Sequence, residues 1–84
     1  MDTRRRLRTY ISETFFVDGY PDQASFLKTG IIDSTGMMEL VAFLESDFGV
    51  KVEDHELVPA NLDSIDNLVA FLDRRTAARP AAAG

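Results

Sequence analysis

The chain has 84 residues, the length of a single domain, with 45% apolar residues and a formal net charge of −5. It contains no cysteine and one histidine, which excludes a disulfide framework and a cysteine or histidine metal cluster. No apolar run approaches the roughly 20 residues that span a bilayer, and the basic start lacks the apolar segment of a signal peptide. We therefore expect a cytoplasmic monomer that binds neither a membrane nor a metal ion.

Charge is unevenly distributed along the chain. Residues 33–73 contain ten acids and one base, whereas seven of the nine bases lie near the two ends. An acidic body repels nucleic-acid phosphates and attracts basic protein surfaces, so we expect protein partners and no nucleic acid. A solvated surface that merely keeps the domain soluble is the simpler interpretation.

The first predicted element is a helix over residues 2–17, capped by Asp2 or Thr3. Its apolar spacing gives an inward stripe of Leu7, Tyr10, Ile11, Thr14 and Phe15. Glycine and proline within residues 18–22 break this helix. Residues 23–32 then form a long connection with a short helical turn bracketed by Ser25 and Gly30. Four apolar residues should anchor it to the bundle: Phe26, Leu27, Ile31 and Ile32.

The second long helix is predicted from Ser34, as its N-cap, to the residue before Gly49, which suits a left-handed C-terminal position. A helical spacing places one set of apolar residues on its inward face: Met37, Leu40, Val41, Leu44 and Phe48. The remaining side chains should project mostly toward solvent: Thr35, Met38, Glu39, Ala42, Glu45 and Ser46. Phe43 should pack against a short third helix.

That short helix is predicted at residues 54–58, ended by Pro59, and a last helix starts within residues 61–64. The inward stripe of the last helix is Ile65, Leu68, Val69 and Leu72. The predicted fold is all-α: an antiparallel bundle of three longer helices and one short helix, with a long loop between the first two. We expect one domain over residues 1–75 and a flexible tail over residues 76–84.

The stretch around the second helix resembles the acyl carrier protein family. Asp33-Ser34 follows Gly-Ile-Ile and precedes Glu39-Leu40-Val41, Leu44-Glu45 and Phe48-Gly49, as in the serine motif and second helix of that family. The resemblance extends over about residues 26–72. It implies a free-standing carrier rather than an enzyme, with 4′-phosphopantetheine from coenzyme A esterified to Ser34. An initiating Met and a complete first helix favour a discrete protein.

The resemblance also implies partners and a surface for them. A phosphopantetheinyl transferase would modify Ser34, helped by Asp33, and an acyl- or aminoacyl-loading ligase and downstream enzymes would follow. The pathway would be of the polyketide, nonribosomal peptide or fatty acid type. The surface that we expect them to contact consists of Thr35, Met38, Glu39, Ala42 and Glu45. Thr35 and Gly36 depart from the commonest family pattern, which argues against a housekeeping fatty-acid role.

Three alternatives concern the serines. Asp63-Ser64 also precedes a helix, but Ser64 is better explained as an N-cap, because the family pattern aligns with Ser34. Ser34 could itself be only a cap, in which case the chain is an unmodified acidic helical interaction module. A Ser-His-Asp hydrolase is not supported, since the single histidine, His55, lies in the third-helix region and no base is paired with Ser34.

Overall fold

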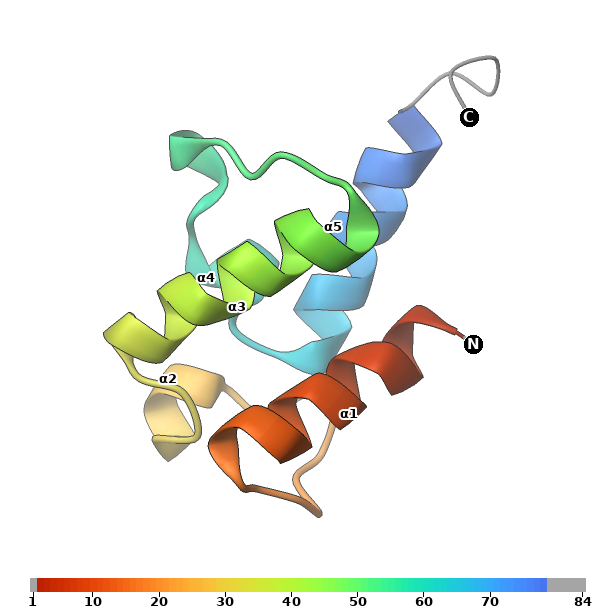
Figure 1. The fold of residues 1–84 in the computed structure, drawn as a ribbon. Coiled ribbons are helices and arrows are strands. Elements are labelled where there is room, and N and C mark those ends of the chain that lie inside the picture. The colour runs from red at the N-terminus through yellow and green to blue at the C-terminus, as the bar shows by residue number, and fades with distance from the viewer. Residues whose placement is uncertain (1, 79–84) are drawn as a thin grey trace.

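The structure, a computed structural model, describes residues 2–78, and all regular elements within them are helices (Figure 1). Three longer helices, α1 (Thr3–Phe15), α3 (Ser34–Phe48) and α5 (Ile65–Ala78), account for most of it. Short elements connect them: α2 (Phe26–Thr29), the 3-10 helix η1 (Asp54–Glu56) and α4 (Pro59–Leu62). No helix in this part of the chain is both long and apolar enough to cross a membrane. The predicted all-α bundle with a long first connection is confirmed.

Local sequence signals set most helix ends. The Asp2 carboxylate caps α1 by accepting the Arg5 N–H at 2.9 Å, and Ser25 caps α2 by accepting the Lys28 N–H at 3.0 Å. Gly30 and Gly49 end α2 and α3 with positive φ angles of 79° and 66°, which glycine adopts without steric cost. The turn expected between Ser25 and Gly30 is therefore present.

Several helix boundaries differ from the predicted ones. The first helix ends at Phe15, two residues earlier than predicted. Pro59 begins α4 rather than only ending the preceding turn, because proline suits the first helical position, where its missing N–H is not needed. The last helix is consequently preceded by a separate short one, and it starts at Ile65. It continues to Ala78, past the expected boundary at residue 75, and residues 79–84 of the expected tail lie outside the described residues.

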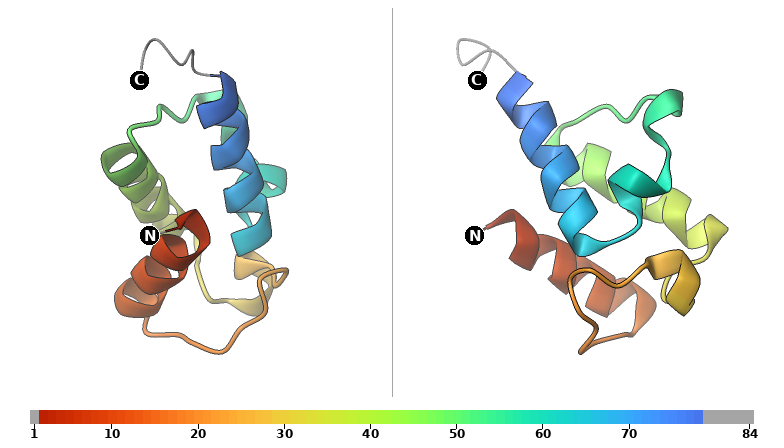
Figure 2. Two further views of the ribbon diagram at one scale, coloured as in Figure 1. Left: turned by 90° about the vertical axis from the view of Figure 1, so that its right-hand side faces the viewer. Right: turned by 180° about the vertical axis from the view of Figure 1, so that it is seen from behind.

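The core joins all three long helices. α3 runs back across α1 in the opposite direction, and α5 packs against α1 and α4 (Figure 2). The predicted stripes supply much of the buried interior, including Leu7, Ile11, Leu40, Leu44, Ile65 and Leu68, each fully buried. Phe71 is also buried, although it lies outside the predicted stripe of the last helix. Val50 and Val52 alternate inward across the loop after α3 and close the core at that end.

Arginines near both ends of the chain form ion pairs with acidic side chains. Arg4 Nη1 donates to Asp22 Oδ2 at 2.6 Å and to Asp66 Oδ1 at 2.7 Å, and Arg8 pairs with the same Asp22 carboxylate. These bonds tie α1 to the first loop and to α5. Near the other end, Arg75 pairs with Glu56.

Candidate functional site

Ser34 lies at the start of α3, with its side chain exposed. The prediction that it caps this helix is wrong by one residue. Asp33 is the N-cap: its Oδ1 accepts the Gly36 N–H at 2.7 Å, and its main-chain oxygen accepts the Met37 N–H at 2.8 Å. Both residue types cap helices well, and the backbone places Asp33 at the cap position. The Ser34 hydroxyl is thereby relieved of a capping role and faces the surface.

The loop that leads to Ser34 is bonded to Asp63, which lies between α4 and α5. Its Oδ1 accepts the Leu27 N–H at 2.9 Å, and its main-chain oxygen accepts the Phe26 N–H at 2.8 Å. The Ser25 hydroxyl donates to the same carboxylate. Phe26 is fully buried, and its carbonyl accepts the Ile32 N–H at 3.2 Å. The N-terminal end of α2 is therefore bonded to Asp63, and the chain that leads to Ser34 bonds back to Phe26.

Gly36, in the first turn of α3, allows the end of α1 to approach closely. A Cβ atom at this position would lie 2.8 Å from Phe15 Cε1 and 3.0 Å from Ile32 Cγ2. The first contact is shorter than real Cβ atoms show, so a side chain at this position would force the ring of Phe15 to shift. The first turn of α3 is thus held between α1 and the loop before Ser34.

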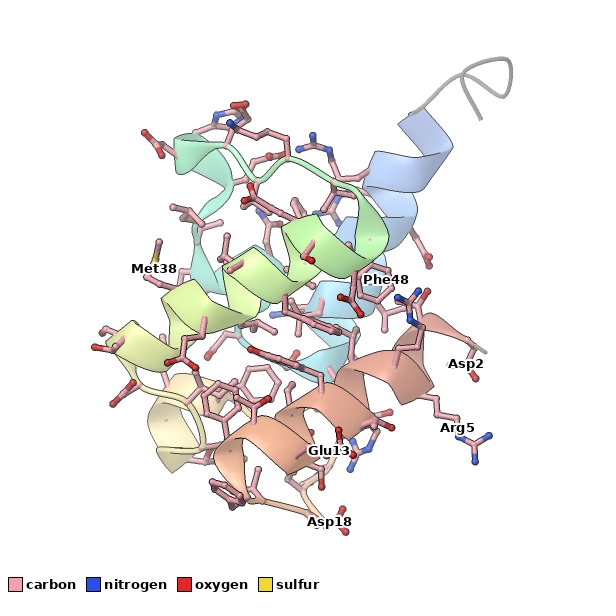
Figure 3. All side chains as sticks on the ribbon, in the orientation of Figure 1. Asp2, Arg5, Glu13, Asp18, Met38 and Phe48 are labelled. Carbon is pink, nitrogen blue, oxygen red and sulfur yellow. The ribbon has the colours of Figure 1, made fainter. Side chains whose placement is uncertain are left out.

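An apolar groove of about 180 Å³ opens beside Ser34. Its walls come from α2, α3, the segment after η1, and α4: Leu27, Met37, Met38, Leu57, Val58, Pro59 and Leu62. Met38 is 57% exposed and extends outward from α3 (Figure 3). The side chains that share this groove with Ser34 carry no acid or base, so none of them could activate its hydroxyl as a hydrolase requires.

The expected contact residues divide into two groups. Thr35, Met38, Glu39 and Ala42 are exposed along α3. Glu45 is half-buried instead, because its Oε2 accepts the main-chain N–H of the buried Val52 at 2.9 Å.

The expected position of Phe43 is wrong. Its ring stacks on Tyr10 of α1, with centroids 3.9 Å apart, rather than packing on the short third helix.

The first turn of α3 is chemically suited to a phosphate group. The leading N–H groups of an α-helix have no acceptor within the helix, and the helix dipole places partial positive charge there. Asp33 satisfies the Gly36 amide. The amides of Ser34 and Thr35 precede it in the same turn and have no acceptor within the helix. A phosphodiester on the Ser34 hydroxyl would lie beside these amides, so the residues present fit such a group.

Two features of the site could not be read from the sequence. The fastening by Asp63 joins residues 36 positions apart, and the groove is completed by a segment after η1. The only local signal, Asp63 beside Ser64 before a helix, indicates a cap and contains nothing about the long-range contact.

Comparison with known proteins defines the class. Residues 5–72 match the family described as a phosphopantetheine attachment site. A protein named as a probable acyl carrier protein, PigG of Serratia sp. (strain ATCC 39006), is 32% identical over 57 residues. This match covers 68% of the chain and 66% of that protein, just under two thirds of its length.

The chain belongs to the phosphopantetheine-attachment family. The prosthetic group of this family is 4′-phosphopantetheine.

Proposed function

We propose that Ser34 carries the 4′-phosphopantetheine and that the protein shuttles acyl or aminoacyl intermediates between biosynthetic enzymes. When bound, the group supplies a terminal thiol that holds the cargo as a thioester. The observation that carries the proposal is an exposed serine in the first turn of α3, with the capping role taken by its neighbour Asp33. Because Asp33 takes the capping role, capping does not account for Ser34, and this supports the carrier over the alternative of an unmodified acidic interaction module.

The other Asp-Ser pair supports Ser34 by contrast. Ser64 is only 5% exposed, and its hydroxyl accepts the Asn67 N–H at 3.1 Å as the cap of the last helix. A modifying enzyme could reach that hydroxyl only after the start of α5 had opened. Ser34 needs no such opening.

The exposed residues of α3 and the apolar groove form one continuous candidate surface for partner enzymes. Met38 belongs to both, and Thr35, Glu39 and Ala42 extend the surface along the helix. A flexible thioether beside acidic side chains suits transient contact with several partners, since Met adapts to different shapes. We propose that the transferase, a loading ligase and the later enzymes of a secondary-metabolite or fatty-acid type pathway dock here, in the cytoplasm. Glu45 takes part through its support of the loop after α3.

The test is modification in vitro. The protein is incubated with coenzyme A, magnesium and a broad-specificity phosphopantetheinyl transferase, and its intact mass is measured. We expect one phosphopantetheine increment in the wild type and in Ser46→Ala, which removes another exposed serine of the same helix. We expect none in Ser34→Ala. An increment retained by Ser34→Ala, or absent from the wild type, would contradict the proposal.

Asp33 has two separable roles in this proposal, capping α3 and contributing charge beside Ser34. Asn caps helices as well as Asp does, whereas Ala does not. We expect Asp33→Ala to lower the stability of the fold by about 1 kcal/mol. Asp33→Asn should keep this stability and slow modification by the transferase. Thermal unfolding and the initial rate of holo-protein formation measure the two effects, and an unchanged rate in Asp33→Asn would limit Asp33 to capping.

A further inference from the structure

Phe16 combines a left-handed backbone with an exposed aromatic side chain, and neither feature favours the stability of the fold. It follows α1 directly in the left-handed conformation, with φ 58° and ψ 43°. Within residues 2–78 it is the single non-glycine residue with positive φ. Its N–H donates to the Ser12 carbonyl at 3.0 Å and so closes the helix, while its side chain is 89% exposed.

Both the backbone conformation and the exposed ring of Phe16 are energetically unfavourable. The left-handed conformation brings Cβ close to the backbone carbonyl, so glycine or asparagine is the usual residue at such a helix end. A benzyl group left almost fully in water also gains nothing from burial. Gly30 and Gly49 end the other two left-handed caps at no such cost. Strain retained at one residue without a local compensation is more typical of functional positions than of structural ones.

The position of Phe16 relates it to Ser34. Phe15, the preceding residue, packs against Gly36 in the first turn of α3, two residues from Ser34. Figure 1 and the right-hand view of Figure 2 place the C-terminal end of α1 and the N-terminal end of α3 on the same side of the molecule. Phe16 therefore belongs to the end of the bundle at which Ser34 is presented.

The enzyme that modifies Ser34 must cover this end. It has to bring its catalytic centre to the serine hydroxyl itself, whereas later enzymes can reach the cargo through the flexible arm. A standard interface covers about 800 Å² of each partner, a patch roughly 30 Å across. A patch of that size centred on Ser34 would extend toward the contact between Phe15 and Gly36, which Phe16 adjoins in sequence.

The surroundings of Phe16 indicate the chemistry of its partner. Glu13 and Asp18 are exposed on either side of it in sequence, and Figure 3 shows both near the C-terminal end of α1. A complementary surface would have an apolar pocket for the ring and basic side chains at its rim. Aromatic side chains inserted into such pockets commonly supply a large part of the binding energy of an interface.

We propose that Phe16 is a docking anchor for the phosphopantetheinyl transferase that modifies Ser34, inserted into an apolar pocket with a basic rim. The inference rests on the proposed role of Ser34. It also accounts for the retention of a strained, exposed aromatic where the backbone favours glycine.

The test compares the kinetics of holo-protein formation for three forms of the full chain. Phe16→Asn removes the ring but suits the left-handed backbone, and Phe16→Tyr keeps the ring. With a broad-specificity transferase, coenzyme A and magnesium, kcat/KM is measured by intact mass at several carrier concentrations. We expect Phe16→Asn to lower kcat/KM on the order of tenfold, mainly through KM. Phe16→Tyr should stay within about threefold of the wild type, as should Lys51→Ala, an exposed change in the loop after α3.

The outcomes separate this inference from the assignment of Ser34. If the wild type is not modified at all, the role of Ser34 fails. If the wild type and Phe16→Asn are modified with equal kcat/KM, only the role of Phe16 fails. A melting temperature markedly lower in Phe16→Asn would overturn the inference in favour of a structural role. Self-association abolished by Phe16→Asn, with unchanged kinetics, would overturn it in favour of a second copy of this chain.

Discussion

At the scale of single residues, the site depends on which side chain caps the first turn of α3. Asp33 accepts the amide of Gly36 and leaves the Ser34 hydroxyl exposed, although both residue types are good caps. The sequence places the helix start correctly to within one residue, but the choice between two adjacent capping residues depends on backbone angles that a sequence does not contain. The same limit applies to Gly36, which in sequence suggests only a cost in helix propensity.

Gly36→Ala provides a test of that packing. Alanine favours a helix by about 1 kcal/mol over glycine, so propensity alone predicts stabilisation. Its Cβ would instead lie 2.8 Å from the ring of Phe15, and overpacking of this kind costs typically about 1–3 kcal/mol. We expect a net loss of about 1 kcal/mol, which lowers the melting temperature by roughly 4–8 °C for a domain of this size. Ser46→Ala, exposed on the same helix, should be neutral or stabilising, and a stabilised Gly36→Ala would contradict the close contact.

At the scale of elements, the three long helices were predictable because their apolar residues repeat at helical spacing. The short elements were not, because contacts distant in sequence determine them. η1 is held by Arg75 of α5, which pairs with Glu56, and by the N–H of Glu53, which donates to the same carboxylate at 3.0 Å. The Glu56 main-chain carbonyl also accepts a bond from the side-chain Nδ2 of Asn61 in α4 at 3.0 Å. These bonds support the outer wall of the groove at Leu57 and Val58.

The stability of this wall should depend on pH. The bond from the Glu53 backbone N–H and the pairing with Arg75 lower the pKa of Glu56 from its ordinary value of 4.5. A carboxyl whose pKa is lower in the folded state stabilises the fold above its unfolded pKa. That contribution is lost as the pH falls through the folded pKa.

Glu56→Gln should therefore be less stable than the wild type at pH 7, by less than about 1 kcal/mol, because the pair is partly exposed. The difference should disappear in thermal unfolding at a pH below the folded pKa, where the wild-type carboxyl is also neutral. Asp54→Asn, an exposed change in the same turn, serves as the control. A difference that stays constant across this pH range would show that the charge of Glu56 contributes nothing.

At the scale of the whole molecule, charge is arranged so that the basic ends neutralise part of the acidic body. Arg4 pairs with both Asp22 and Asp66, Arg8 pairs with Asp22, and Arg6 Nη2 lies 3.5 Å from Asp47 Oδ2. The uneven charge along the sequence was apparent from the start, but these pairings depend on the folded arrangement. Within the proposed docking surface, Glu39 is an exposed acid that directly follows Met38.

The transfer reaction should consequently depend on salt. Exposed charges at the edge of an interface act mainly on the association rate, and salt screens them. We expect Glu39→Gln to lower kcat/KM for modification by roughly threefold at low ionic strength and to approach the wild type at high salt. Asp54→Asn, which removes the same charge from η1, should leave both values unchanged. Equal salt dependence in the wild type and Glu39→Gln would exclude a role for this carboxylate in steering.

The fastening of α2 by Asp63 affects how mutants of the second Asp-Ser pair should be interpreted. Asp63 and Ser64 hold the serine-bearing loop and the start of α5 in place. A substitution at either residue can therefore reduce the yield of holo-protein by loosening the scaffold, although no attachment point has been removed. Without a correction for the folded fraction, such a mutant would be mistaken for evidence of a second prosthetic-group site.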